Sequence, residues 1–110
     1  MDEQVIPVLR VAHADDAVTW YERLGFTKEW EHRFDPDCPA FVSIARGQAR
    51  IYLSEHRGDA RPDTLLHLVV NDADPVVAEF GRQADETPYG CEIELRDPDG
   101  NRLRISAVKG

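Results

Sequence analysis

Carboxylates and arginines alternate along two neighbouring stretches near the end of the chain. Glu92 and Glu94 lie two residues apart in CEIELRD, and Arg102 and Arg104 lie two residues apart in NRLRISA. If both stretches are strands, each pair shares one face, because successive side chains of a strand point to opposite faces. Two interpretations stay open: cross-strand ion pairs worth ~0.2–1 kcal/mol each, or the polar floor of a ligand-binding cleft.

Histidine and cysteine are the other candidates for metal binding or nucleophilic chemistry. A lone histidine in a cavity is more often a hydrogen-bonded wall residue than a metal ligand. The four histidines are spread over a predicted helix start, two strands and a loop: His13, His32, His67 and His56. Cys91 shares the face of core-type residues, and Cys38 has no basic neighbour that would activate its thiol. Neither cysteine is expected to act as a nucleophile.

Aromatic side chains are concentrated in the predicted strands. Flat rings give planar ligands a large contact area, although aromatic residues also serve cores and dimer contacts equally well. The candidate groove residues are Trp30, His32, Phe34, Phe41, Tyr52 and Tyr89.

The elements that position these residues begin with a strand at 5–11. In the stretch 12–26, apolar residues recur at three- and four-residue spacing, which predicts a helix. Asp15 and Asp16 suit its first turn, and Gly25 suits the position after its last turn.

Three further strands complete the first half. FTKEWEHRF (26–34) alternates, which predicts a strand with Phe26, Trp30, His32 and Phe34 on one face. AFVSIAR (40–46) and ARIYLSEH (49–56) flank Gly47 as a predicted hairpin. The first half therefore has the order β-α-β-β-β.

The second half follows a loop rich in charge, glycine and proline at 57–63 and repeats this order. A strand is predicted at 64–70 and a helix within 71–83, with Asp74 as N-cap and Pro75 as the first helical residue. The irregular stretch 84–90 has room for a short strand. Strands at 91–97 and 101–107 follow, joined by an Asp-Pro-Asp-Gly turn.

The two halves align with each other. At an offset of 59 (65 − 6), Ile6 matches Leu65, and RIYLS (50–54) matches RLRIS (102–106) at an offset of 52. We therefore expect an α+β fold of two βαβββ modules, about 4–56 and 64–108, within a single domain spanning 1–110.

Composition limits the partners. The 110 residues carry a net charge of −8, which repels phosphate backbones and makes nucleic acid a poor partner. A cationic ligand is easier to accommodate, although solubility alone would explain the charge. The first residues lack a basic segment before an apolar core, and no apolar run reaches the ~20 residues of a membrane span. We expect a cytoplasmic protein without membrane contact.

The paired modules, LRVAHADDAVTWYERLGF near the start and LRDPDGNRLRIS near the end resemble the vicinal oxygen chelate superfamily. This superfamily includes glyoxalase I, extradiol dioxygenases and bleomycin-resistance proteins. WEHRF, LSEHRGDARP, PYGCEIE and DPDGNRLR are similar to a glyoxalase-like subgroup with bleomycin-resistance members. The resemblance implies paired curved sheets that form a cleft.

In the metal-dependent relatives, ligands lie on the first and last strands of each module. The resemblance carries these positions onto Ile6, Tyr52, Leu65 and Arg104. Metal sites of this kind need imidazole or carboxylate donors, and an arginine presents only hydrogen-bond donors and a positive charge. We therefore expect no metal and no cofactor at these positions. By its spacing from Leu65, His67 is expected to face the same cleft.

Two functional hypotheses remain. The first is a non-catalytic binding protein that sequesters a bleomycin-like, cationic and aromatic antibiotic; the resemblance implies a homodimer with a cleft at the interface. The second is a glyoxalase-type lyase, isomerase or dioxygenase with a displaced metal site at His67, Glu92 or Glu94. The missing ligands favour the first. Its expected cleft residues are Trp30, His32, Phe34, Phe41, Tyr52, His67, Tyr89, Glu92, Glu94, Arg102 and Arg104.

Overall fold

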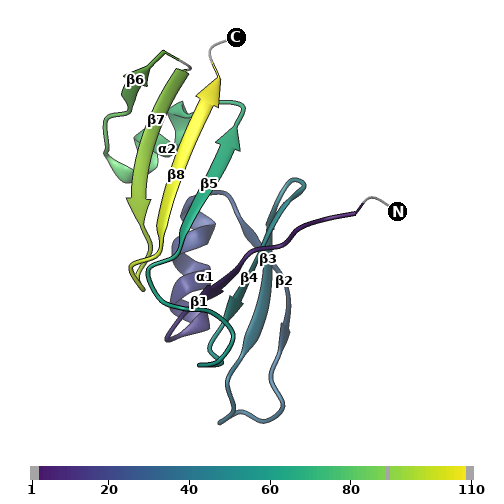
Figure 1. The fold of residues 1–110 in the computed structure, drawn as a ribbon. Helices are drawn as coiled ribbons and strands as arrows, with labels where there is room; N and C mark the ends of the chain where they lie inside the picture. The colour runs from purple at the N-terminus through teal and green to yellow at the C-terminus, as the bar shows by residue number, and fades with distance from the viewer. Residues whose placement is uncertain (1–2, 89, 109–110) are drawn as a thin grey trace.

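Two four-stranded sheets and two helices make up the protein. The computed structural model describes residues 3–88 and 90–108 (Figure 1). The first half contains β1 (Val8–Arg10), α1 (Ala14–Arg23), β2 (Thr27–His32), β3 (Phe41–Arg46) and β4 (Ala49–Ser54). The second contains β5 (Leu65–Val70), α2 (Asp74–Phe80), β6 (Asp85–Thr87), β7 (Gly90–Arg96) and β8 (Arg102–Val108). The predicted α+β class and both β-α-β-β-β orders are confirmed.

The strand order is the same in the two sheets. It runs β1-β4-β3-β2 in the first and β5-β8-β7-β6 in the second, with the outer pairs β1–β4 and β5–β8 parallel. Val8 pairs with Tyr52, and His67 pairs with Arg104. Val8 and His67 are 59 positions apart (67 − 8), and Tyr52 and Arg104 are 52 apart (104 − 52). The strand register therefore reproduces both offsets of the sequence repeat.

One face of each sheet packs against the helices. In the first sheet the buried apolar positions alternate along the strands, as in Val42, Ile44, Ile51 and Leu53. In the second sheet they are Ile93, Leu95, Leu103 and Ile105. This period of two is what a half-buried strand requires.

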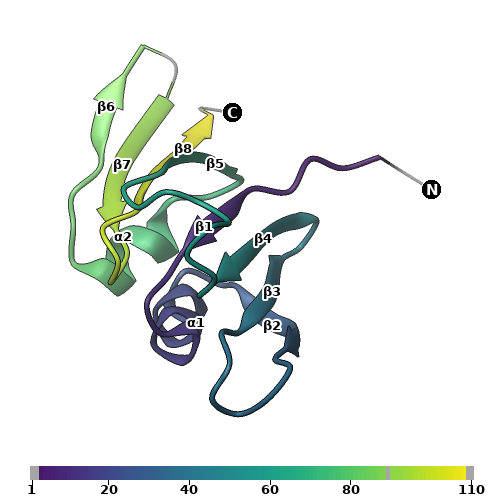
Figure 2. The ribbon, with the colours of Figure 1, turned by 60° about the horizontal axis from the view of Figure 1, so that its bottom comes forward.

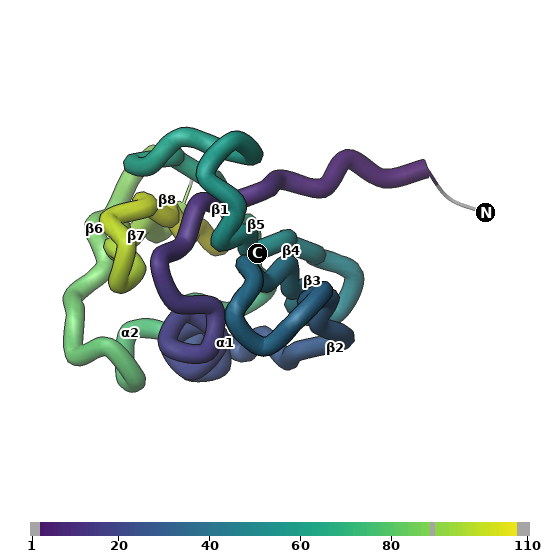
Figure 3. The backbone as a smooth tube through the Cα atoms, turned by 90° about the horizontal axis from the view of Figure 1, so that it is seen from below, coloured from purple at the N-terminus to yellow at the C-terminus, as the bar shows by residue number. Residues whose placement is uncertain are grey.

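Helix α1 lies between the two sheets in both Figure 1 and the view from below in Figure 3. It also contacts the second module. The ring centroids of Trp20 and Phe80 are 5.3 Å apart, and Arg23 Nε lies 2.9 Å from Glu79 Oε1. The opposite faces of the sheets are therefore left available for a ligand or a partner. No helix in the described part of the chain is long and apolar enough to cross a membrane.

The predicted alternation of the 26–34 stretch is wrong at its start. A register shift between Lys28 and Trp30 marks a β-bulge in β2. Phe26 is buried in the core at 1% exposure, whereas the Trp30 side chain is 44% exposed. An extra residue in one strand shifts the alternation by one, so Phe26 and Trp30 do not share a face.

The predicted start of the second helix is displaced by one residue. The N-cap is Ala73, and Asp74 is the first helical residue, followed by Pro75. The carboxylate that caps this end belongs to Asp72, whose Oδ1 accepts a 3.0 Å hydrogen bond from the backbone N–H of Asp74. The expected glycine after α1 is confirmed: Gly25 has a φ of 92°, in the region that glycine tolerates best.

Candidate functional site

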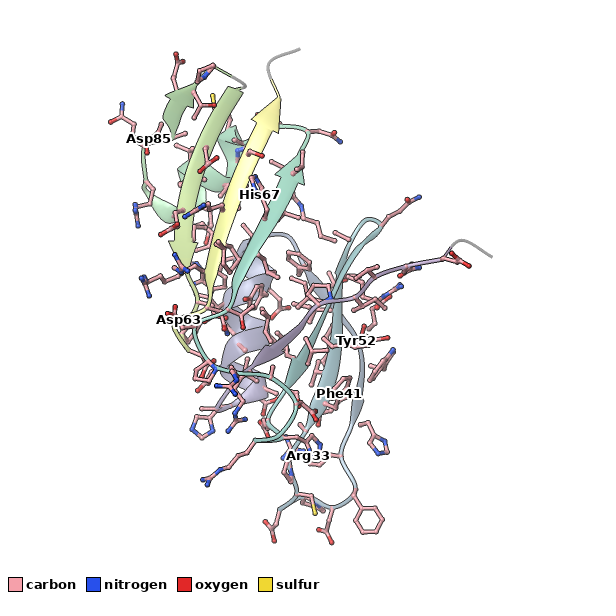
Figure 4. The ribbon with its side chains drawn as sticks, in the orientation of Figure 1. Arg33, Phe41, Tyr52, Asp63, His67 and Asp85 are labelled. Atoms are coloured by element: carbon pink, nitrogen blue, oxygen red, sulfur yellow. The ribbon has the colours of Figure 1, made fainter. Side chains whose placement is uncertain are left out.

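Three aromatic rings form a cluster on the open face of the first sheet. Phe41 and Tyr52, labelled in Figure 4, have ring centroids 5.1 Å apart. The Trp30 ring stacks on Phe41 at 6.1 Å with 15° between the planes, and it lies 5.4 Å from Tyr52. Because Trp30 is 44% exposed, part of its ring is free for a ligand. These three residues are called the aromatic cluster below.

A carboxylate–guanidinium pair lies beside the aromatic cluster. Glu29 Oε1 accepts hydrogen bonds from Arg50 Nε at 2.6 Å and from Ser43 Oγ at 2.7 Å, while its Oε2 accepts one from Arg50 Nη2 at 2.9 Å. The hydrogen bonds from Arg50 and then Ser43 lower the pKa of Glu29 to about 2.

Sequence reasoning missed Glu29, because strict alternation assigned it to the face opposite Trp30. The bulge in β2 brings both side chains to the open face, where Glu29 contacts Ser43 and Trp30 stacks near Tyr52, the cross-strand partner of Ser43. The irregular register could not have been read from periodicity.

The open face of the second sheet is polar and charged. Arg104 Nε donates a 3.0 Å hydrogen bond to Oε1 of Glu94, which is its cross-strand neighbour on β7. This contact lowers the pKa of Glu94. Cross-strand pairing, one of the two interpretations of these charges, is therefore observed for Glu94 and Arg104. Arg102 lies instead near the loop, with its Nε 3.6 Å from Asp63 Oδ1.

His67 and Glu92 lie on another part of the open face of the second sheet. His67 Nε2 and Ser106 Oγ are 3.0 Å apart and share a hydrogen bond. Glu92 pairs with Ser106 across the strands. All three residues line a cavity of about 500 Å³ next to β6 and β7. Figure 4 shows His67 on the same side of β5 as the viewer.

A further cavity connects the two modules. Its volume is about 320 Å³, and its walls include Arg50 of the first sheet and His67 of the second. Arg50 holds Glu29 beside the aromatic cluster, and His67 holds Ser106 beside Glu92. The cavity therefore lies between the two sheets, with one neighbour of the aromatic cluster and one residue of the polar face in its wall.

Some of the predicted cleft residues are not brought together. Phe34 follows β2 in a loop and is 89% exposed, and the ring contacts of the cluster do not include it. His32, by contrast, is exposed at the end of β2 and pairs with Phe41 across the strands, so it lies beside the aromatic cluster without a ring contact to it. Tyr89 lies outside the described residues. Of the six predicted groove residues, three thus form the aromatic cluster.

The positions that hold metal in the related enzymes do not fit a metal ion here. Ile6 and Leu65 have no donor atom, Tyr52 packs its ring against Phe41 and Trp30, and the Arg104 guanidinium binds Glu94. A guanidinium at such a position would repel a cation. Within residues 3–88 and 90–108, no three His, Cys, Asp or Glu side chains form a group able to hold a metal.

Comparisons with known proteins agree with the architecture. The family model described as "Glyoxalase superfamily protein" matches residues 1–110. The fold is similar to a bleomycin resistance determinant encoded on the transposon Tn5, with 20% identity, a TM-score of 0.76, and coverage of 99% of this chain and 100% of that one.

Two solved structures from Streptomyces extend this similarity. One is the bleomycin-binding protein of bleomycin-producing Streptomyces verticillus complexed with copper(II)-bleomycin, with 28% identity, a TM-score of 0.68, and coverage of 99% and 100%. The other is TnmS3, an antibiotic binding protein from Streptomyces sp. CB03234, with 19% identity, a TM-score of 0.75, and coverage of 99% and 98%. No curated protein matches the chain by sequence.

Proposed function

The chain belongs to the glyoxalase superfamily, and from this premise we propose that it is a non-catalytic protein that binds a planar, cationic small molecule. An antibiotic of the bleomycin type is the first candidate, because structurally similar proteins bind bleomycin or carry the name of bleomycin resistance. Binding without chemistry would withdraw the antibiotic from its target.

The observation that carries the proposal is the aromatic cluster. Trp30 stacks on Phe41 and is still 44% exposed, so a flat ligand can extend the stack without disturbing the core. Stacked rings contribute ~0.5–1.5 kcal/mol beyond the effect of area burial. A single stacked ring therefore accounts for up to about a tenfold change in affinity.

The charge preference comes from the whole chain and from Glu92. Glu29 and Glu94 are each held by an arginine, so each pair is close to neutral. Glu92 lines the cavity with His67 and Ser106 and faces a serine across the strands. Together with the net charge of −8, it favours a cationic group over an anionic one.

A second copy of the chain completes the cleft in this proposal. The open face of β5 carries Leu65 at 42% and Val69 at 65% exposure, and Trp30 is exposed on the first sheet. Exposed apolar side chains on open sheet faces are typical of surfaces that a partner covers. A two-fold homodimer would cover both sheets at once.

Isothermal titration calorimetry with metal-free bleomycin and with copper(II)-bleomycin tests the proposal. We expect saturable binding of at least one form, and weaker binding of a neutral planar compound of similar size. The proposal fails if no cationic planar compound produces heat while a thiol adduct is turned over. That result would assign the protein to the glyoxalase-type enzymes, and His67 would be the first residue to replace.

A further inference from the structure

Part of the β7 edge has no neighbouring strand. Strand β6 pairs only with Gly90, Cys91 and Glu92, through Thr87, Glu86 and Asp85. Within residues 3–88 and 90–108, no strand pairs with the outer edge of β7 from Ile93 to Arg96. In the first module the equivalent edge is covered, because β2 pairs with β3 from Phe41 to Ala45.

The open edge results from the shorter second module. The segment that connects α2 to β6 makes a wide arc away from β7 in the views of Figures 2 and 3. A cavity of about 300 Å³ lies beside the edge, lined by Arg82 from this segment and by Glu94, Leu95 and Arg96 of β7. The cavity thus adjoins the part of β7 that β6 does not cover.

The edge is regular enough to accept a strand. The register between β7 and β8 runs without a shift from Gly90 to Arg96, so the unpaired side presents backbone N–H and C=O groups at regular spacing. In the first sheet, the outer strand on the corresponding side, β2, is interrupted by its bulge. A small molecule satisfies one or two such groups, whereas an extended peptide matches the alternating donors and acceptors.

The side chains around the edge define the chemistry of that peptide. The rings of Trp20 and Phe80 are half-buried, lie 5.3 Å apart and line the cavity, so they offer an apolar surface to one side chain. Arg82 has no ion-pair partner among the described residues, and Arg96 has only a 3.8 Å contact with the exposed Asp63.

Two arginines next to an apolar pocket favour an acidic peptide. The neighbouring Glu94 is already bound to Arg104, which reduces its repulsion. The net charge of −8 opposes an acidic partner at long range, but salt screens charges beyond ~8 Å at physiological ionic strength. Arg82 and Arg96 line the cavity, and Glu94, which lines it with them, is already paired with Arg104, so the charge within this distance favours an acidic segment.

We propose that the β7 edge from Ile93 to Arg96 is a docking site for an extended acidic segment of a partner protein. The segment adds as a strand beside β7, packs an apolar side chain against Trp20 and Phe80, and places carboxylates near Arg82 and Arg96. The site lies outside the aromatic cluster and does not depend on the proposed ligand.

Fluorescence polarisation with a labelled peptide tests the proposal on the full chain. The probe is fluorescein-labelled Glu-Glu-Val-Leu-Val-Glu-Glu, and saturable binding is expected below about 1 mM. Arg82→Glu and Arg96→Glu should each weaken binding at least about tenfold, since each replaces attraction by repulsion. Arg57→Glu, in the exposed loop before β5, is the matched control and should cause a smaller change.

Two further measurements separate strand addition from charge alone. A peptide N-methylated at alternate residues should lose binding if its backbone pairs with β7, and the amides at 93–96 should gain protection from hydrogen exchange only with the unmodified peptide. The proposal is overturned by absent binding, by equal binding of the N-methylated peptide, or by equal effects of Arg57→Glu and Arg82→Glu. Protection that rises with protein concentration alone would identify a second copy as the occupant and would also overturn it.

Discussion

The hydroxyl of Tyr21 on α1 donates a 2.8 Å hydrogen bond to Oδ2 of Asp97, in the turn that joins β7 to β8. Both residues are buried, at 0% and 5% exposure. Asp97 also accepts hydrogen bonds from the backbone of Asp99 and from the backbone and side chain of Asn101. The first module is therefore connected to the second by a buried polar contact as well as by apolar packing.

Tyr21→Phe should destabilise the protein by about 1.5–3 kcal/mol, the usual contribution of a hydrogen bond to a charged group. The substitution keeps the ring contacts with Trp20 and Phe26 and removes only the hydroxyl. Urea denaturation measures the change in the free energy of unfolding. A loss no larger than that of an exposed control such as Thr19→Val would contradict the role of this contact.

The same contact predicts a dependence on alkaline pH. Burial, followed by the Asp97 carboxylate, raises the pKa of Tyr21 above its ordinary value of 10.0. A tyrosine whose pKa is raised by folding stabilises the fold fully below pH 10, and this contribution falls as the pH rises further. Tyr21→Phe should therefore flatten the fall in stability above pH 10, as measured by thermal melting across a pH series.

Trp30→Ala should weaken binding of a planar cationic ligand by about tenfold, because it removes the exposed ring of the aromatic cluster. Phe34→Ala is the matched control. It removes an aromatic side chain from the neighbouring loop, which has no ring contact with the cluster. Titration calorimetry compares the two, and equal losses would mean that the ligand binds elsewhere on this side of the molecule.

Glu94→Gln should weaken ligand binding less than Trp30→Ala does. Arg104 lowers the pKa of Glu94 and holds its carboxylate, so at neutral pH the residue acts mainly through a partly screened charge. The dependence of affinity on salt concentration should therefore become flatter in the variant. A loss larger than that of Trp30→Ala would indicate direct contact between this carboxylate and the ligand.

The purified protein should contain far less than one transition metal ion per chain, because Ile6, Tyr52, Leu65 and Arg104 supply no suitable set of donors. Elemental analysis measures the content. A chelator should leave the melting temperature unchanged, since no structural metal would be removed. Stoichiometric zinc, iron or nickel would reject this prediction.

In solution we expect a dimer with twice the chain mass of 12.5 kDa. Light scattering at micromolar concentration checks this mass. Val69→Asp places a charge on the open face of β5, where the valine is 65% exposed, and should shift the equilibrium towards the monomer. A wild-type mass near that of one chain would contradict the proposed assembly.

The repeat could be predicted from sequence because it depends on regular periodicity. The match of Ile6 with Leu65 comes from the 59-residue offset that relates Val8 to His67 in the sheets. The contact between Glu94 and Arg104 could also be predicted from the sequence, because alternation along the strands places both side chains on one face.

The position of Glu29 could not be predicted, because it depends on a bulge that alternation does not reveal. The contact between Tyr21 and Asp97 could not be predicted from the sequence either, since it joins residues that are 76 positions apart on different elements. The prediction for Phe34 assumed that the strand continues to this residue. Strand β2 ends at His32, and beyond that point alternation no longer determines which way a side chain points.

The bulge in β2 makes the binding face sensitive to insertions and deletions. Phe26, before the bulge, belongs to the core, whereas Glu29, within the bulge, and Trp30, after it, belong to the open face. A one-residue deletion at Lys28 would restore regular alternation across β2 and exchange the faces of the residues on one side of it. Such a change in length would therefore remodel the candidate site in a single evolutionary step.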